Sequence, residues 1–318
     1  MAAETWPALP YDAWRETYAN LHLRTQIVGK IRLVQTPWIN HSWHVTQYVT
    51  ARGLTTGPIA HDDRTFQIDF DFIDDRLVIE ASDGGKRTLP LVEQTIADFY
   101  TAVMKALGEL RLDVHINPLP SEVENPIRFD QDREHRVYDA EAARRFWRAL
   151  FQVNRVFTLF RSGFLGKVSP VHFFWGSFDL AVTRFSGRPA PLMQSSGPGL
   201  SLAVAREAYS HEVSSAGFWP GGAGVDYAAF YSYAYPQPEG FSKARVEPRE
   251  TFYHEELGQF LLPYDVVRTA ASPDDVLLAF LQSTYEAAAD NARWDRAALE
   301  CPYGMPNVPR PVAAPSRS

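Results

Sequence analysis

The feature of this 318-residue chain that most constrains its fold is a partial internal repeat. A shift of 133 positions places Trp14–Arg15 on Trp147–Arg148, and a shift of 181 positions places Arg87–Thr88 on Arg268–Thr269. The second copy therefore carries 48 additional residues, the difference between the two shifts, and we place this insertion at about 186–257. Repeats of this length predict two similar folded units that face each other.

Both copies have the same order of predicted elements, a helix followed by strands and a second helix. Apolar residues recur at helical spacing over 10–33, 91–110 and 139–163, and a last helix is predicted to begin at Ser272. Strands and hairpin turns between these helices are typical of antiparallel pairing. We therefore predict an α+β fold, two related helix–antiparallel strands–helix units packed as one pseudo-symmetric body. The predicted ranges are 1–116 for unit 1, 117–135 for a proline-rich linker, 136–301 for unit 2 and 302–318 for a disordered tail.

The clearest strand signal lies at 65–73, where apolar and polar residues alternate. Such alternation predicts a half-buried strand with one face in the core and one in water. The expected wet face carries Gln67, Asp69 and Asp71, and the expected buried face carries Phe66, Ile68, Phe70 and Phe72. Further strands are predicted at 38–50, 169–185, 226–235 and 258–268.

Composition excludes several classes of protein. The net charge of −7 without a basic block disfavours a nucleic-acid-binding surface. The single cysteine, Cys301, excludes an intrachain disulfide and a cysteine metal site. The chain has no run of 18 apolar residues and its start does not look like a signal peptide, so we expect no membrane span and a cytoplasmic location.

The first candidate site is formed by histidines on equivalent predicted strands. His41 and His44 lie on the strand at 38–50, and their spacing of three places them on opposite faces. His172 and Trp175 lie on the strand at 169–185. Two facing units would bring His41 and His172 together as ligands of a divalent metal, because imidazole pairs are common metal ligands. The alternative is that both are histidines at the edge of the core, hydrogen-bonded to the backbone.

The second candidate site lies in the insertion and on the strand after it. His211 and Glu212 offer an acid/base pair, and Trp219 begins a segment rich in proline and glycine. Tyr231 and Tyr233 share one face of the strand at 226–235, as expected for a pocket wall. The alternatives are a surface loop that caps one sheet and a partly exposed tyrosine face. We expect the functional centre to belong mainly to unit 2, with the insertion folded back over its sheet.

Two stretches of the chain have a distinctive composition, one from Ser214 through Phe218-Trp219-Pro220-Gly221 and one from Ala228 to Pro236. They resemble a bacterial family recorded only as a domain of unknown function, and the resemblance extends from about Trp6 to Trp294. It implies a soluble bacterial protein and carries over no catalytic residue.

No motif fixes a reaction, since the chain lacks a Gly-rich phosphate loop, an HExxH spacing and a Gly-x-Ser-x-Gly elbow. We expect a small-molecule-binding protein that acts as an enzyme and has an aromatic, histidine-containing pocket. A divalent metal is its candidate cofactor. The alternatives are a binding module without catalysis and an interaction protein, and the oligomeric state stays open. The catalytic candidates are His172, His211 and Glu212, and the ligand-binding candidates are His41, His44, Trp175, Trp219, Tyr231 and Tyr233.

Overall fold

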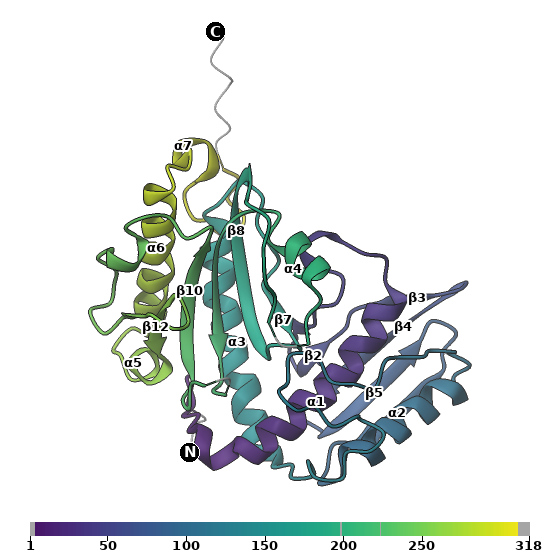
Figure 1. Ribbon diagram of the computed structural model, residues 1–318. Helices are drawn as coiled ribbons and strands as arrows, with labels where there is room; N and C mark the ends of the chain where they lie inside the picture. The colour runs from purple at the N-terminus through teal and green to yellow at the C-terminus, as the bar shows by residue number, and fades with distance from the viewer. Residues whose placement is uncertain (1–3, 198, 223, 311–318) are drawn as a thin grey trace.

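The computed structural model describes residues 4–197, 199–222 and 224–310. Within these ranges the chain forms seven α-helices and two antiparallel sheets, an α+β fold. Figure 1 shows the first half of the chain in purple and blue beside the second half in teal to yellow. The helices are α1 (Tyr11–Gln35), α2 (Ile96–Glu109), α3 (Ala140–Ser162), α4 (Leu202–Ala208), α5 (Tyr264–Arg268), α6 (Pro273–Asn291) and α7 (Arg296–Leu299).

The first sheet has the strand order β1-β2-β4-β5-β6, and β3 pairs with β4 outside this path. Consecutive strands pair because short turns join them, as in a meander. Its strands are β1 (Tyr48–Val49), β2 (Gly53–Thr55), β3 (Ile59–His61), β4 (Arg64–Asp71), β5 (Arg76–Ala81) and β6 (Lys86–Pro90).

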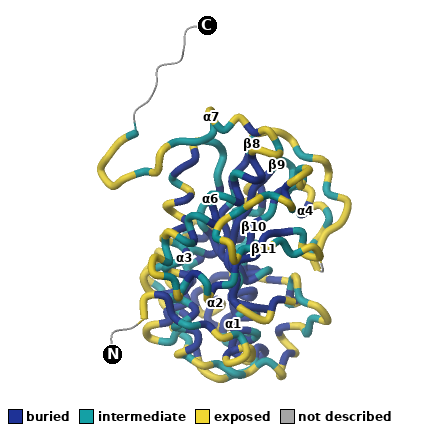
Figure 2. The backbone as a smooth tube through the Cα atoms, turned by 90° about the vertical axis from the view of Figure 1, so that its left-hand side faces the viewer, coloured by how far each residue is buried: buried dark blue, intermediate teal, exposed yellow. Residues whose placement is uncertain are grey.

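The second sheet has the order β11-β12-β10-β9-β8-β7. One side of this sheet is covered by α3 and α6, which pack on β8, β9 and β10. Figure 2 shows the buried residues inside both halves, with exposed residues on the outside. The strands are β7 (His172–Phe174), β8 (Asp179–Pro189), β9 (His211–Trp219), β10 (Ala229–Tyr235), β11 (Phe252–His254) and β12 (Gln259–Pro263).

The strand predicted at 65–73 forms as β4, and its predicted core face is confirmed. Phe66, Ile68, Phe70 and Phe72 are each at most 2 % exposed. The opposite face departs from the prediction at Asp71, which is 6 % exposed. Asp71 is buried because it lies at the strand end, where its carboxylate accepts a 2.9 Å hydrogen bond from Arg52.

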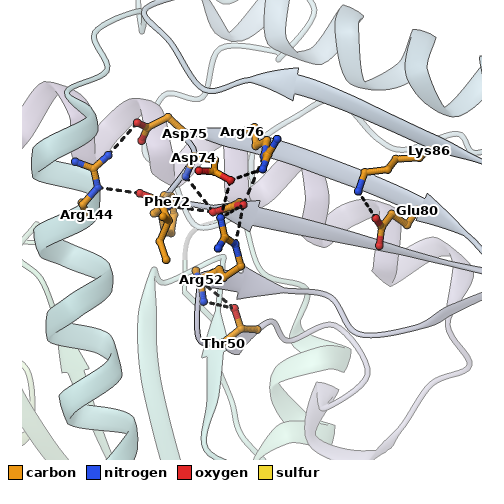
Figure 3. A network of polar contacts seen from close by, with 12 residues as sticks. Thr50, Arg52, Phe72, Asp74, Asp75, Arg76, Glu80, Lys86 and Arg144 are labelled. Carbon is orange, nitrogen blue, oxygen red and sulfur yellow. Dashed lines mark hydrogen bonds and ion pairs between the residues drawn. The ribbon is translucent and has the colours of Figure 1, made fainter.

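A polar network continues from this strand end to the second half of the molecule (Figure 3). Arg52 also bonds the carboxylate of Asp74, at 2.7 Å. On α3, Arg144 donates to the carbonyl oxygen of Phe72 at 3.0 Å and to the carboxylate of Asp75 at 2.9 Å. The turn between β4 and β5 is therefore fixed to the first helix of the second half.

Further contacts join the two halves, through their backbones and through their first helices. The backbones of Gln47 and Phe173 exchange hydrogen bonds of 2.9 and 2.8 Å, next to β1 and β7. The ring of Trp14 on α1 packs against that of Phe146 on α3, with centroids 5.2 Å apart. The core is consequently continuous between the two halves.

Several predicted elements differ from the structure. Residues 38–50 are not one strand, because a 3-10 turn, η1 (Asn40–Ser42), places His41 at a φ of 59°, and the range contains only the short strand β1 at its end. The range 169–185 is two strands, β7 and β8, joined by a turn. The strand predicted at 258–268 ends at Pro263, where α5 begins.

The insertion does not fold back over the sheet as a whole. Residues 211–219 form β9, which pairs with both β8 and β10 and thus lies inside the second sheet. Only the stretch that leads into α4 reaches the far side, where α4 packs against η1. In Figure 1, α4 and α6 lie on opposite sides of the second sheet.

The C-terminal stretch of the described chain packs against α3. Residues 302–310, part of the predicted disordered tail, contact the end of α3, where the Gly304 amide donates to the Ser162 hydroxyl at 3.1 Å. Residues 311–318 lie outside the described residues. Across the described ranges, no helix is both long and apolar enough to cross a membrane.

Candidate functional site

A cavity of about 410 Å³ lies against the second sheet on the face that α3 and α6 leave free. Its volume is in the range of small-molecule sites. The opposite wall comes from η1, from residues 121–122 of the predicted linker and from the stretch around α4. Both halves of the chain therefore contribute to one cavity.

Strand register explains which side chains of the sheet enter the cavity. Alternate residues of a strand point to the same face, so Asp179, Ala181, Thr183 and Phe185 of β8 line it together. The neighbouring strands add Val213 and Ser215 of β9 and Tyr231 and Tyr233 of β10. The residues between them, such as Val182 and Phe218, belong to the core below the sheet.

Gly217 lets a tyrosine cross the sheet toward an acid. It pairs with Ala181 on one side and with Tyr231 on the other. A Cβ atom at position 217 would lie 2.3 Å from the Tyr231 hydroxyl oxygen. The tyrosine ring therefore lies over β9, and its hydroxyl donates a hydrogen bond to the Oδ2 atom of Asp179 on β8.

Asp179 is a buried acid, 4 % exposed. Its Oδ1 atom accepts a hydrogen bond from the Ser177 hydroxyl and its Oδ2 atom the one from Tyr231. Burial raises its pKa to about 6, although both hydrogen bonds act in the opposite direction. No ion pair neutralises it among the described residues.

Glu122 is a second acid, on the opposite wall. It has a φ of 57°, and its Oε1 atom lies over Gly176, where a Cβ atom would approach it to 2.1 Å. Glu122 is an exposed residue that lines the cavity. Desolvation of its carboxyl group, with the nearby charge of Asp179 as the second cause, raises the pKa of Glu122 to about 7.

Helix α1 holds the Glu122 wall in place with polar side chains at positions i, i+4 and i+8. His22 contacts the carbonyl oxygen of Gly176 at 2.8 Å. Gln26 bonds both the amide and the carbonyl group of Ser121, each at 2.8 Å. Lys30 donates to the Ser121 hydroxyl at 3.0 Å. The acid is thus positioned by a helix of the first half.

Further hydroxyl groups surround the two acids. The hydroxyls of Tyr209 and Tyr233 lie 3.0 Å apart, and those of Thr183 and Ser215 lie 2.8 Å apart. The Tyr231 and Tyr233 rings stack, with centroids 6.1 Å apart. The predicted tyrosine wall therefore lines the cavity, as do His41, His172 and Trp175.

The two cavity histidines differ in their bonding. His41 contacts the carbonyl oxygen of Ala208 through Nδ1 at 2.8 Å and the ammonium group of Lys167 through Nε2 at 2.5 Å. Both of its nitrogens are therefore engaged by the protein. His172 is 1 % exposed and its Nδ1 atom has no hydrogen-bond partner within the described chain. Burial lowers the pKa of His172 to about 3, so its ring is neutral at physiological pH.

The bonding of His41 argues against the predicted metal pair, His41 and His172. A metal needs a free nitrogen lone pair, and His41 offers none in this arrangement. Residues 4–197, 199–222 and 224–310 also contain no group of three or more His, Cys, Asp or Glu side chains suited to a metal ion.

Four other predicted site residues do not line the cavity. His44 is buried beside it and accepts a 3.2 Å hydrogen bond from the amide of Ile39. His211 lies near the rim, its ring centroid 6.1 Å from that of His41. Glu212 points away because it neighbours a cavity-facing residue on β9, and it pairs with Arg188 at 2.6 Å. Trp219 ends the same strand and packs on Tyr231 at 4.5 Å.

Sequence reasoning missed Asp179, Glu122 and Tyr209. Asp179 gave a signal, since it is the only acid of an apolar segment, residues 178–185. Glu122 gave none, because it lies in a charged, proline-containing stretch that has the composition of a linker. Chemically, the cavity offers two carboxyl groups, tyrosine hydroxyls and a neutral imidazole among aromatic rings.

Comparison with known proteins gives a family and no close relative. No curated protein and no solved structure matches the chain. The expected resemblance to a domain family of unknown function is confirmed. Residues 6–301 match DUF5996, described as a family of unknown function, and because this match covers most of the chain, the protein belongs to that family.

Proposed function

We propose that the protein binds a small organic molecule in the cavity on the second sheet. The observation that carries this proposal is the 410 Å³ cavity itself, where an apolar aromatic wall meets a few convergent polar groups. Small-molecule sites have this combination because apolar contacts supply binding free energy while polar groups fix orientation.

Filling the cavity tests the proposal. Ala181 lines it from β8, and the Ala181→Leu side chain would occupy part of the space. Ala203, exposed on α4 and outside the lining, gives the matched control Ala203→Leu. Ligand-observed NMR with a fragment library should find binders to the wild type and to Ala203→Leu that are lost in Ala181→Leu. Equal binding to all three proteins would contradict the proposal.

The second candidate function is catalysis in the same cavity. The observation that favours it is the carboxyl group of Glu122. Its carboxyl group reaches the cavity, and its pKa of about 7 suits proton transfer near neutral pH. Each fragment that binds would be incubated with the wild type and with Glu122→Gln and followed by NMR for chemical change. Turnover by the wild type alone supports an enzyme, whereas unchanged ligands support a binding module.

We also propose that the two halves are an internal duplication and that the functional centre belongs mainly to the second. The shared order of helix, sheet and helix supports this, as does the pairing of α1 with α2 and of α3 with α6. The contact between Trp14 and Phe146 joins positions 132 apart, close to the repeat shift of 133. Experimental coordinates should superpose α1 and α2 on α3 and α6 with one rotation, and unrelated positions would contradict the duplication.

A further inference from the structure

We propose that the ligand is an organic cation, an amine on an aromatic or otherwise apolar body, whose ammonium group lies between Asp179 and Glu122. This inference rests on the proposed function and names the ligand class of the same cavity. It differs from that function because it would fail if the cavity bound neutral or anionic molecules instead.

The charges that face the cavity are of one sign. Its lining contains two carboxyl groups, and no lysine or arginine is found among the lining residues that the structure describes. Neither Asp179 nor Glu122 forms an ion pair in the described ranges. A buried charge such as that of Asp179, which is 4 % exposed, is normally paired, because removal from water is costly for an isolated ion. The protein supplies no partner here, and a cationic ligand would.

The lysines nearest the lining are held elsewhere. Lys30 donates to the hydroxyl of Ser121, and Lys167 contacts His41 with its ammonium group over the ring of Trp43. Each contacts a lining residue and neither acid, and the charge of neither lysine shifts the pKa of Asp179 or Glu122. Their positive charge therefore does not replace a counter-ion at the two acids.

The remaining walls fit a flat apolar body. Trp43, Phe174 and Phe185 line the cavity, and the ring of Trp43 lies 5.9 Å from that of Phe185. Faces of aromatic rings attract cations as well as apolar groups. His172 belongs to the same wall, where its ring lies 4.6 Å from that of Phe174.

Three indole compounds that differ in charge test the inference. Tryptamine carries an ammonium group, tryptophol a hydroxyl and indole-3-propionate a carboxylate. Isothermal titration calorimetry at pH 8, where both acids are ionised, should give tryptamine at least about tenfold tighter binding than tryptophol. Indole-3-propionate should bind most weakly, because its charge repels both acids.

Isosteric variants test whether the two acids cause the preference for tryptamine over tryptophol. Asp179→Asn and Glu122→Gln should each reduce tryptamine affinity several-fold and leave tryptophol affinity unchanged within about twofold. Glu212→Gln removes an acid from the other face of the same sheet and should change neither. Glu122 keeps accessible surface, so its variant remains informative should Asp179→Asn fail to fold.

The possible results distinguish a failure of the cation inference from a failure of the proposed small-molecule function. Equal or tighter binding of tryptophol or indole-3-propionate overturns the cation inference and leaves the small-molecule function standing. A tryptamine preference that survives both acid variants also overturns it. An absence of binding by all three indoles and by the fragment library counts against the inference and the proposed function together.

Discussion

The hydroxyl group of Tyr231 on β10 donates a hydrogen bond to the carboxylate of Asp179 on β8, although β9 lies between the two strands. This contact exists because position 217 of β9 is a glycine, over which the tyrosine ring lies. One missing side chain in the middle strand thus determines how an acid and a hydroxyl group meet in the cavity.

The Gly217→Ala variant should displace Tyr231 and weaken ligand binding. The new methyl group would clash with the ring at 2.3 Å and break the bond to Asp179. We expect a loss of about 1–3 kcal/mol in the free energy of unfolding, as for overpacked sites. Gly108→Ala on α2 is the control, since its methyl group meets nothing within 4 Å and alanine is the better helix former. Urea unfolding of both variants checks this, and equal stability would contradict the role of Gly217.

The difference in unfolding free energy between the Asp179→Asn variant and the wild type should shift in favour of the wild type as the pH falls from 8 to 5. The folded pKa of about 6 lies above the ordinary aspartate value of 3.8, so ionised Asp179 destabilises the fold at high pH. Below about pH 6 the folded protein takes up a proton that the unfolded chain does not, and this penalty decreases. The difference in unfolding free energy should fall by on the order of 1 kcal/mol between pH 8 and pH 5. A difference that is constant over this range would contradict the raised pKa.

Replacing His172 should cost the free protein less than replacing His41. His172→Leu removes a buried nitrogen that has no partner, so we expect stability within about 1 kcal/mol of the wild type. His41→Leu removes the contacts with Ala208 and Lys167 and should cost about 1–3 kcal/mol. Unfolding curves at pH 8, where both rings are neutral, give the comparison. The reverse order would show that His172 has a bonded role.

The Phe70→Ala variant should lower the unfolding free energy by about 3–5 kcal/mol. The ring of Phe70 is 1 % exposed in the core of the first sheet. Phe252→Ala is the matched control on a strand of the second sheet, where the ring is 41 % exposed, and it should cost less than about 1 kcal/mol. Chemical denaturation measures both, and similar losses would contradict the burial of β4.

Local patterns in the sequence predicted the elements, and contacts between distant segments determined the site. The period-two row around Phe70 and the helical spacing over 139–163 identify β4 and α3, because each pattern reflects burial on one face. The predicted strand around His41 failed because η1 is held from outside its range, where the Glu207 carboxylate accepts a 2.8 Å hydrogen bond from the His41 amide. Likewise, the position of Glu122 depends on α1, about a hundred residues earlier. The hydrophobic periodicity within a segment does not predict its contacts with distant parts of the chain.

The anchoring of Ser121 by Gln26 and Lys30 has a consequence for any attempt to divide the chain. The stretch 117–135 is the natural place to separate two repeats, yet a cut before Glu122 would part this acid from the helix that positions it. A fragment that begins after Glu122 would keep Asp179, Tyr231 and the whole second sheet while lacking one of the two acids. Reconstitution from two separately expressed fragments would therefore recover the complete cavity only when α1 and the segment carrying Glu122 are both present.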